Sequence, residues 1–599
     1  MKKNKKSEDV SEIVKKIVLY RKAMRDLSKE LGRFDIEKDE QDQIRENVNK
    51  LRYVVSNIEN EYFRDINKGM YLGLGIDLLD TASTDIVPVY LQWDKITNHV
   101  GVLGASGLGK TILMLSNIKD TIAKGWNTVI VDPKGGEGQE VVNGVMSFCK
   151  ENNLLENTYY LSPMMPESSF LMNVIFGMGN VEVAITLREL MMGENTDPFY
   201  GDITYKVVLA IMYCFEFLEK VADEDGLIAK QEIDEELKKH KAIMKMNNLA
   251  SRFDIANDTT EDGLVEDFAS NSLVLDATQN VRSKRTLVTF RDIAMYVTHD
   301  DLSELQDLVE QTNIPDDHLY KAQMNKLKKD ALFTINDALR QEKTFFSKVS
   351  TSLSTVLTKL SSGDVGDIFC TIRVNPMSKI LASKNNERFI LIVQPFPLTY
   401  GDISNTIIKL ILKQLSSLFG NIGSTERKIN RVAVFIDEAG SVFYPNISEL
   451  YNKVRSLGGS IFAYTQSYQD YIDALGETKA KMVMDNINTT IRMGMNDIES
   501  AKKVVEEVGQ GVEFNSTTVA ATGTNDSRVI VQKNSEDILS PTDITMLPVG
   551  RGIVKFKDVS ATGRIFLVDF AHYGKIYSNI KFTTNKYFQE IDRQNELGL

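Results

Sequence analysis

Residues 104–111, with the sequence GASGLGKT, constrain the fold of this chain more than any other segment. They match the pattern G-x-x-x-x-G-K-[ST]. The short apolar run NHVGVLG leads into them, and the helical pattern TILMLSNIKDTIAKG follows. In a strand–loop–helix unit of this kind, glycines let backbone N–H groups turn inward, and the helix directs its positive dipole end at the same point. The segment therefore predicts a phosphate-binding loop in an α/β domain.

The loop residues have distinct expected roles. Lys110 is expected to reach the β- and γ-phosphates of a nucleotide, and the Thr111 hydroxyl is expected to bind Mg²⁺. ATP and Mg²⁺ are therefore the expected cofactors. The expected nucleotide-binding residues are Gly104, Ala105, Ser106, Gly107, Leu108, Gly109, Lys110 and Thr111.

A second acidic element is required beside such a loop, and residues 432–440, VAVFIDEAG, supply it. Asp437 follows an apolar strand pattern, at the end where ligands bind in open α/β sheets, and is expected to share the Mg²⁺ ion with Thr111. Glu438 follows directly and is expected to activate the attacking water. This pair indicates an ATP hydrolase rather than a kinase.

The two motifs are far apart in sequence, and an inserted helical domain accounts for much of the gap. Residues 178–345 show mostly helical apolar spacing, as in ITYKVVLAIMYCFEFLEKVA, QEIDEELKKHKAIMKM and DDLSELQDLVEQ. Strand patterns resume afterwards as RFILIVQPF, RVAVFIDEAG, GSIFAYTQS and TTIRMGM, and then as GRGIVKFKD and GRIFLVDF. An α/β domain interrupted by an all-α domain is the expected organisation.

The first 70 residues predict two amphipathic helices, each with a narrow apolar seam. Two interpretations stay open: the helices pack on each other or on the main body, or they form a docking arm for another protein. The seam residues are Val10, Ile13, Ile17, Tyr20, Met24, Leu27 and Leu31 in the first helix, and Ile44, Val48, Leu51, Val55, Ile58 and Tyr62 in the second.

Composition excludes several classes of protein. The formal net charge of −13 excludes a uniformly basic DNA-coating protein, although a local basic groove is compatible with it. Cys149, Cys214 and Cys370 are scattered, as reduced thiols of a cytosolic protein would be, and no zinc-ligand spacing occurs. No apolar stretch approaches the length of a membrane span, and MKKNKKSEDV lacks the apolar core of a signal peptide. We expect a cytoplasmic protein, peripheral at the inner face of the membrane through a partner.

Over roughly residues 85–580, the ordered motifs resemble the type IV coupling proteins, the VirD4, TraG and TraD proteins of conjugation and type IV secretion. These proteins belong to the wider FtsK and HerA group of hexameric motors. The motifs that carry the resemblance are VIVDPKGGE, the helical insert, FIDEAG, SLGGSIFAYTQSYQDY and ILSPTDITMLPVGRGIVKF. The resemblance implies a RecA-like P-loop domain with an inserted all-α domain, and the apolar seams of the first 70 residues predict an N-terminal helical hairpin in front of it. The expected divisions are 1–70 (hairpin), 71–177 (nucleotide-binding, first part), 178–345 (insert), 346–580 (nucleotide-binding, second part) and 581–599 (tail).

The resemblance also implies further site residues. Gln466 ends a strand expected next to the acidic strand, where it would sense the γ-phosphate or polarise water. Arg455 stands where the family supplies an arginine finger to the neighbouring subunit, which implies a homohexameric ring. Asp132 and Lys134 are candidates for lining the same site.

The implied function is an ATP-driven motor that feeds relaxase-bound DNA, expected to be single-stranded, into a type IV secretion channel. Most coupling proteins begin with two transmembrane helices, whereas this chain offers two amphipathic helices there, so we expect the hairpin to bind a small membrane-anchor protein. A VirB4-like assembly ATPase, an FtsK-like translocase on double-stranded DNA, and a substrate receptor without DNA-pumping activity remain alternatives.

Overall fold

The computed structural model forms two compact units. The first comprises Met1–Thr128, Gly138–Asn152 and Arg431–Asn579, and the second comprises Val129–Glu137, Asn153–Asn430 and Ile580–Leu599. The structure describes residues 10–31, 37–80, 85–96, 99–133, 140–191, 198–222, 288–316, 321–341, 343–370, 377, 380, 388–425, 430–444, 447–520, 527–557 and 564–572. The expected tail, residues 581–599, lies outside these ranges.

A mixed sheet forms the centre of the first unit, with the strand order β2-β1-β13-β12-β9-β3-β8-β7. Strands β9, β3, β8 and β7 run parallel to one another, whereas the remaining neighbours pair antiparallel. The bounds are β1 Met70–Asp77, β2 Val87–Leu91, β3 Val100–Leu103, β7 Val432–Ile436, β8 Gly459–Thr465, β9 Thr489–Met493, β12 Arg551–Phe556 and β13 Arg564–Phe570.

Strands β3, β7 and most of β8 read as apolar runs because both faces of the sheet are covered. Every residue of β3, β7 and β8 is buried. All strand patterns expected in this part of the sequence are present, whereas β1 and β2 were not expected. The helices of this unit beyond the N-terminal pair are α3 Lys110–Lys124, α4 Glu140–Glu151, α17 Ala439–Val442, α18 Ile447–Val454, α19 Gln469–Leu475, α20 Glu477–Asn486, α21 Ile498–Val508 and α22 Pro541–Thr545.

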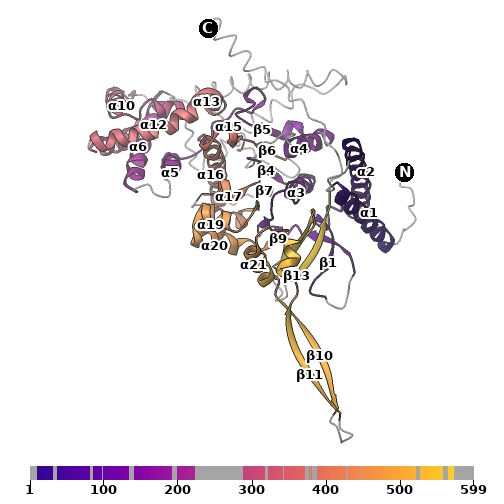
Figure 1. Ribbon diagram of the computed structural model, residues 1–599. Coiled ribbons are helices and arrows are strands. Elements are labelled where there is room, and N and C mark those ends of the chain that lie inside the picture. The colour runs from indigo at the N-terminus through magenta and orange to yellow at the C-terminus, as the bar shows by residue number, and fades with distance from the viewer. Residues whose placement is uncertain are drawn as a thin grey trace, which may run out of the picture. The chain divides into compact units, whose positions relative to one another are not determined.

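The N-terminal helices, α1 Val10–Glu30 and α2 Lys38–Tyr62, form the expected hairpin and lie side by side (Figure 1). Ile17 and Val55 pack in one cluster with Tyr71 of β1 and with Ala571, just after β13. The two helices therefore pack on each other and on the body of the first unit. This confirms the interpretation that they pack within the protein.

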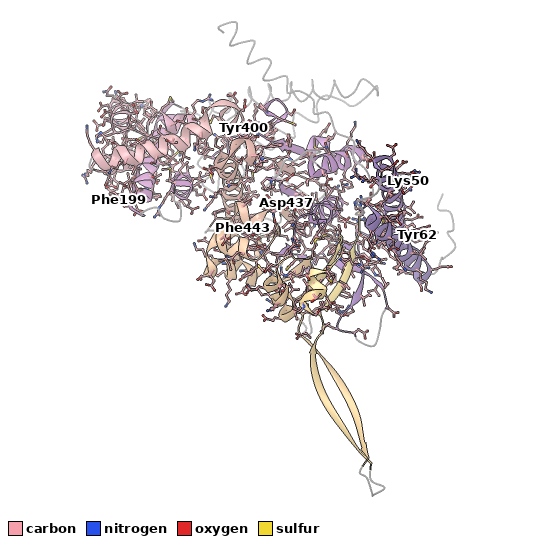
Figure 2. The ribbon with its side chains drawn as sticks, viewed as in Figure 1. Lys50, Tyr62, Phe199, Tyr400, Asp437 and Phe443 are labelled. Atoms are coloured by element: carbon pink, nitrogen blue, oxygen red, sulfur yellow. The ribbon has the colours of Figure 1, made fainter. Side chains whose placement is uncertain are left out.

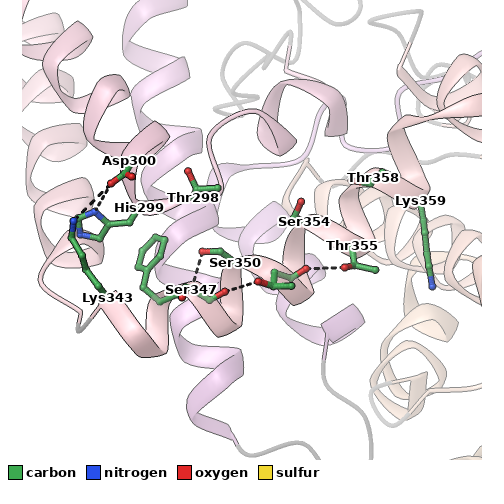
Figure 3. Close-up of a pocket in the computed structure, with 12 residues that line it drawn as sticks. Thr298, His299, Asp300, Lys343, Ser347, Ser350, Ser354, Thr355, Thr358 and Lys359 are labelled. Atoms are coloured by element: carbon green, nitrogen blue, oxygen red, sulfur yellow. Dashed lines mark hydrogen bonds and ion pairs between the residues drawn. The ribbon is translucent and has the colours of Figure 1, made fainter.

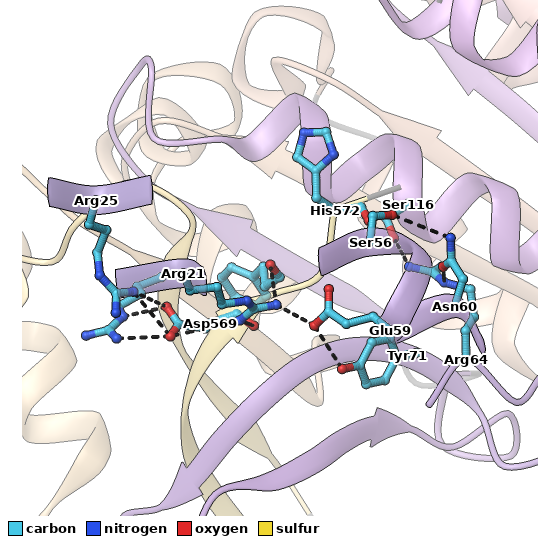
Figure 4. A network of polar contacts seen from close by, with 12 residues as sticks. Arg21, Arg25, Ser56, Glu59, Asn60, Arg64, Tyr71, Ser116, Asp569 and His572 are labelled. Atoms are coloured by element: carbon cyan, nitrogen blue, oxygen red, sulfur yellow. Dashed lines mark hydrogen bonds and ion pairs between the residues drawn. The ribbon is translucent and has the colours of Figure 1, made fainter. Parts of the chain in front are cut away.

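Buried polar contacts reinforce this packing (Figure 4). Arg21 of α1 donates to the Glu59 carboxylate of α2 at 2.5 Å and to the backbone carbonyl of Asp569 in β13 at 2.7 Å. Arg64, after α2, donates to Asp120 of α3 at 2.5 Å. Because Glu59 and Asp120 are almost fully buried, each carboxylate depends on its arginine for compensation.

The second unit combines three strands with the helical insert. The chain passes into it within β4 Asn127–Val131, and β6 Ile390–Val393 lies between β4 and β5 Thr158–Leu161. The predicted end of the insert at residue 345 falls inside α12 Lys343–Ser361, and helical structure continues through α13 Gly363–Cys370. The expected helix at residues 231–246 lies outside the described residues. The helices are α5 Asn180–Met191, α6 Pro198–Ala222, α9 Phe290–Ala294, α10 His299–Gln311, α11 Lys321–Leu339, α12 Lys343–Ser361, α13 Gly363–Cys370, α15 Pro397–Tyr400 and α16 Asp402–Thr425.

Helix α6 lies at the core of the insert and packs on α5 and α11. The cavity along α12 is about 750 Å³ and is lined mainly by hydroxyl side chains of that helix (Figure 3). Thr351 and Thr355 donate to carbonyls one turn earlier in the same helix, so these hydroxyls already have partners.

Two further features complete the fold. Strands β10 Gln510–Ala520 and β11 Ser527–Asp537 form an antiparallel two-stranded ribbon separate from the main sheet (Figure 1). None of the described helices has both the length and the apolar character that crossing a bilayer requires.

Candidate nucleotide-binding site

The phosphate-binding loop joins β3 to α3 and has the backbone shape that its glycines permit. Gly107 and Gly109 have φ angles of 79° and 97°, in the left-handed region, and Gly109 is the residue that precedes the first turn of α3. Gly104 is required for a different reason, since a Cβ atom there would lie 2.7 Å from Cβ of Met493. Gly104, Gly107 and Gly109 thus each have a physical role in the shape of the loop.

Three later segments of the chain hold this loop through backbone hydrogen bonds. Gly104 N–H donates to the carbonyl of Thr465 at the end of β8, at 3.3 Å, and Ala105 N–H donates to that of Gly494 after β9, at 2.9 Å. On the far side, the N–H of Gly550 donates to the carbonyl of Leu108 at 3.1 Å. The loop is therefore preorganised by the strands on both sides of β3 and by the segment before β12.

Lys110 is buried, with 6% of its surface exposed. Its Nζ donates to the carbonyl of Gly104, and to that of Ala105 at 3.1 Å. The ammonium group thus lies over the loop, where an anionic phosphate would be a stronger partner than two neutral carbonyls. Thr111 follows in the first, half-buried turn of α3.

The acidic pair lies at the same edge of the sheet as the loop. Asp437 comes directly after β7, and 1% of its surface is exposed (Figure 2). Its Oδ1 accepts a hydrogen bond from the N–H of Glu438 at 3.0 Å. Because β8 is the one strand between β7 and β3 and all three are parallel, the acids and the loop are about 10 Å apart, at adjoining strand ends.

Glu438 has an unusual backbone conformation, with φ and ψ both 46°. A non-glycine residue in this region is uncommon, and such strain is concentrated at functional sites. The turn is held because Glu438 O accepts hydrogen bonds from both the N–H and the hydroxyl of Ser441, each at 2.8 Å.

The residues present fit a nucleotide with Mg²⁺. The left-handed glycines, the N-terminus of α3 and the Lys110 ammonium form a cradle for phosphates. Thr111 and Asp437 bring one hydroxyl and one carboxylate, which are oxygen ligands of the kind that Mg²⁺ prefers.

Gln466 is exposed at the carboxyl end of β8, next to β7 as the resemblance implies. Sequence reasoning missed the residue that fixes its position, Asp470. The Asp470 carboxylate accepts from the N–H groups of Gln466 and Ser467, each at 3.0 Å, and from the Thr465 hydroxyl at 2.7 Å. Partial burial raises the pKa of Asp470, but hydrogen bonds from Thr465 and Ser467 outweigh burial and hold the pKa below its usual value.

Asp470 also explains the glycine of the DEAG segment. A Cβ atom on Gly440 would lie 2.4 Å from Cβ of Asp470, so the turn after the acidic pair and the turn that carries Gln466 are in direct contact. The signal for Asp470 was present in the sequence, because Ser467 stands three residues before it in a helix-starting pattern.

Arg455 is exposed in the 3-10 helix Arg455–Leu457, which precedes β8. It therefore lies at the amino edge of a seven-residue strand whose other end leads to Gln466. Seven residues of β-strand span about 23 Å. The structure thus does not bring Arg455 together with the loop and acids of its own first unit.

The segment beside Arg455 is tied to the start of β3 through His99. The N–H of Ile461 donates to Nδ1 of His99 at 3.1 Å, which places the imidazole proton on Nε2. This Nε2–H of His99 donates to the carbonyl of Tyr451 at 2.9 Å. Burial lowers the pKa of His99 to about 4. A neutral imidazole therefore joins α18, β8 and β3.

The two remaining candidates stay predictions. Asp132 belongs to the second unit, where it accepts a hydrogen bond from Nε2 of Gln394 at 3.0 Å. Lys134 lies outside the described residues.

Two domain models and two curated relatives match the chain. The model for the "TraM recognition site of TraD and TraG" covers residues 431–549, and that for the "Helicase HerA, central domain" covers residues 77–262. The type IV secretion system-coupling protein VirD4 of Bartonella henselae is 25% identical over 205 residues, which are 34% of this chain and 30% of that protein. VirD4 of Bartonella quintana is 26% identical over 184 residues, which are 31% of this chain and 27% of that protein. In these segments the chain is similar to the TraG, TraD and VirD4 coupling proteins.

The family models divide the candidate site between them. The segment that matches the HerA central domain contains the phosphate loop, and the segment that matches TraD and TraG contains Asp437, Glu438, Arg455 and Gln466. The matched segment spans less than a third of the length of either VirD4 relative.

A solved structure shows a weaker likeness to this chain. The plasmid coupling protein TrwB in complex with ADP and Mg²⁺ is 14% identical, with 83% of this chain and 91% of that chain covered and a TM-score of 0.47.

Proposed function

We propose that this chain is a coupling protein that hydrolyses ATP at the site formed by residues 104–111, Asp437 and Glu438, and uses the energy to deliver relaxase-bound DNA to a type IV secretion channel. The observation that carries the proposal is the placement of the loop and the acidic pair at adjoining ends of parallel strands, with β8 alone between them. In this arrangement a nucleotide and an attacking water meet at one edge of the sheet.

The residues of the chain divide the work of hydrolysis. Lys110 moves from the loop carbonyls to the β- and γ-phosphates, and Thr111 and Asp437 hold Mg²⁺. When bound, Mg²⁺ neutralises charge on the phosphate oxygens. Glu438 accepts a proton from the attacking water, and the Gln466 side chain orients that water or contacts the γ-phosphate.

The position of Arg455 favours a ring. About 23 Å of strand separates Arg455 from the carboxyl edge of its own sheet. A catalytic role for Arg455 would therefore be at the nucleotide site of a neighbouring subunit. A homohexamer with nucleotide at each subunit boundary is the assembly proposed. In mixtures of Arg455→Ala and Lys110→Ala subunits, hydrolysis should recover above either variant alone, because some boundaries join an intact loop to an intact arginine. Absence of recovery in assembled rings would remove Arg455 from the site.

The hairpin of α1 and α2 is proposed to contact a small membrane-anchor protein through its outer surface. Leu19, Tyr53 and Val54 are exposed apolar residues there, and Leu19 has 69% of its surface exposed. Because the inner face is part of the core, point substitutions test this idea better than truncation does. Leu19→Asp with Tyr53→Asp should reduce membrane co-sedimentation in cells that hold the secretion apparatus, with ATP hydrolysis unchanged.

One experiment tests the proposed function most directly. The rate of phosphate release is measured with single-stranded DNA, with double-stranded DNA and without DNA, while light scattering reports the mass. Stimulation by single-stranded DNA in a hexamer supports the motor, and stimulation by double-stranded DNA alone favours an FtsK-like translocase. Hydrolysis that is indifferent to DNA indicates an assembly ATPase.

Two variants separate a motor from a passive receptor. Glu438→Gln should bind ATP but release phosphate at least about 100-fold more slowly, and Lys110→Ala should lose both binding and hydrolysis. If either variant still supports conjugative transfer at the normal frequency, the chain acts as a substrate receptor instead.

A further inference from the structure

A cavity of about 490 Å³ in the first unit lies between the phosphate loop and the N-terminal helix pair. Gly109 and Ile112 line it from the loop and from the first turn of α3. Met24 of α1 and Arg52 of α2 line it from the opposite side, and Phe570 lines it at the end of β13. We call this space the hairpin cavity, and its volume is within the range of small-molecule sites.

The strand order indicates what should occupy the hairpin cavity. Strand β3 has β8 and then β7 on one side, and β9 and then β12 and β13 on the other. Asp437, Glu438 and Gln466 follow β7 and β8, so the γ-phosphate belongs on that side of the loop. A nucleotide is an extended molecule, and its α-phosphate and nucleoside must therefore leave toward β9, β12 and β13.

The hairpin cavity lies on that second side. Val549 and Gly550, which precede β12, line it, and the N–H of Gly550 donates to the carbonyl of Leu108 at 3.1 Å. The cavity thus adjoins the loop on the side toward which the nucleoside of a bound nucleotide would extend.

The chemistry of the lining suits a base and a ribose. Ile112, Val549 and Phe570 offer apolar surface, and Val549 has 66% of its surface exposed. Arg52 is exposed on α2, where its guanidinium donates to Oδ1 of Asn49 at 3.2 Å. The planar face of such a group stacks on aromatic rings. Arg21, in contrast, donates hydrogen bonds to Glu59 and to the carbonyl of Asp569. It therefore stabilises the wall of the cavity rather than contacting a ligand (Figure 4).

We propose that the nucleoside of the bound nucleotide occupies the hairpin cavity, and that α1 and α2 form its outer wall, with Met24 and Arg52 as contact residues. This inference rests on the proposed ATP site. It gives the N-terminal hairpin a part in nucleotide binding in addition to its packing role, so a partner that binds the outer surface of the hairpin acts on the wall of the nucleotide site.

The test compares a ligand that fills both parts of the site with a ligand that fills one. Isothermal titration calorimetry on the full chain measures binding of Mg²⁺–AMP-PNP and of Mg²⁺–tripolyphosphate, which lacks a nucleoside. Met24→Trp fills the cavity and should weaken the affinity for AMP-PNP at least tenfold, while the affinity for tripolyphosphate should change less than twofold. Lys22→Trp, on the exposed side of the same helix, is the matched control and should change neither affinity.

Other outcomes separate this inference from the proposed function. If Met24→Trp weakens neither ligand, or both equally, the nucleoside lies elsewhere and the inference is wrong. If Lys110→Ala leaves both affinities unchanged, the loop is not the phosphate site and the proposed function itself fails. Arg52→Ala is a second variant on an exposed side chain and should weaken AMP-PNP about fivefold, with tripolyphosphate unchanged.

A measurement on the unaltered chain avoids any effect of substitution on folding. Photolabelling with 8-azido-ATP, followed by peptide mass spectrometry, should place the label within residues 21–59, 548–550 or 569–572, and excess ATP should abolish it. Label confined to other segments, or no ATP-protected label on a chain that binds AMP-PNP, overturns the inference.

Discussion

Oδ2 of Asp470 accepts a hydrogen bond from the backbone N–H of Gln466 at 3.0 Å. The same oxygen accepts from the N–H of Ser467 and from the Thr465 hydroxyl, so one carboxylate fixes the turn that presents the Gln466 side chain. Asp470→Ala should therefore lower kcat for ATP hydrolysis about 10- to 100-fold, with a smaller change in KM, because the turn loses its position while the phosphate loop stays intact. Steady-state phosphate release measures both quantities.

Helix α19 supplies a matched control for Asp470. Asp473 is an exposed carboxylate on the same helix and bonds to the side chain of Gln469. Asp473→Ala should leave kcat within about twofold of the parent value. Equal losses in the two variants would contradict a positioning role for Asp470 and indicate a general effect on α19.

Gly104 should not tolerate a side chain. A Cβ atom would approach Cβ of Met493 to 2.7 Å, and both atoms belong to tightly packed strand ends. Gly104→Ala should weaken AMP-PNP binding by about tenfold, since the loop must shift to relieve the overlap. Gly420→Ala in α16 meets open space and should leave binding unchanged, so equal affinities for the two variants would contradict this account.

The buried ion pair between Arg21 and Glu59 should make α1 important for stability. Removing one partner of such a pair leaves an uncompensated buried charge, so Arg21→Ala should lower the free energy of unfolding by about 3 kcal/mol or more. Arg25 contacts Asp569 from a more exposed position on the same helix, and Arg25→Ala should cost less than about 1 kcal/mol. Urea unfolding followed by tryptophan fluorescence compares the two, and a cost for Arg25→Ala as large as that for Arg21→Ala would refute the explanation.

His99 should make the first unit sensitive to acid. Burial lowers its pKa from 6.5 in the unfolded chain to about 4 in the folded protein, so the unfolded state binds the proton more readily between these values. The contribution of neutral His99 to the free energy of unfolding is complete above pH 6.5. It is lost as the pH falls toward 4, by about 3 kcal/mol in total. Urea midpoints measured from pH 7.5 to pH 4 follow this loss.

A neutral replacement at the same position tests the assignment to His99. His99 has a φ of 57°, a conformation that asparagine tolerates, and an amide does not titrate. His99→Asn should be less stable at neutral pH but should show a flatter dependence between pH 6.5 and 4. A dependence as steep as that of the parent protein would assign the acid sensitivity to other groups, such as His572, whose pKa burial lowers to about 3.

Local patterns predicted most of the parallel strands and the helices of the insert. VAVFI is apolar throughout and GSIFAYT is largely so, because both faces of these strands are covered, and such runs are readable from sequence. Strand β1, MYLGLGID, was missed since its two glycines weaken the strand signal, although Gly73 is needed where backbone of β13 approaches it closely.

The tertiary role of several residues had no local signal. The seam of α1 predicted burial, but nothing in its periodicity indicated that Arg21 would pair with Glu59 and reach Asp569 near the other end of the chain. Arg455 is similar, because its distance from the phosphate loop follows from the direction of β8 and not from its neighbours in sequence. Long-range pairing of this kind is decided by topology.

The phosphate loop has a consequence for how the chain is made. Its carbonyl and N–H partners, Thr465, Gly494 and Gly550, are all translated long after residues 104–111 have left the ribosome. A nascent chain therefore carries the loop sequence for most of its synthesis without the strands that shape it, and nucleotide cannot stabilise the early intermediates. Under the proposed function, competence to bind ATP is therefore acquired late, when the last strands of the first unit are in place, and it reports that the first unit has been completed.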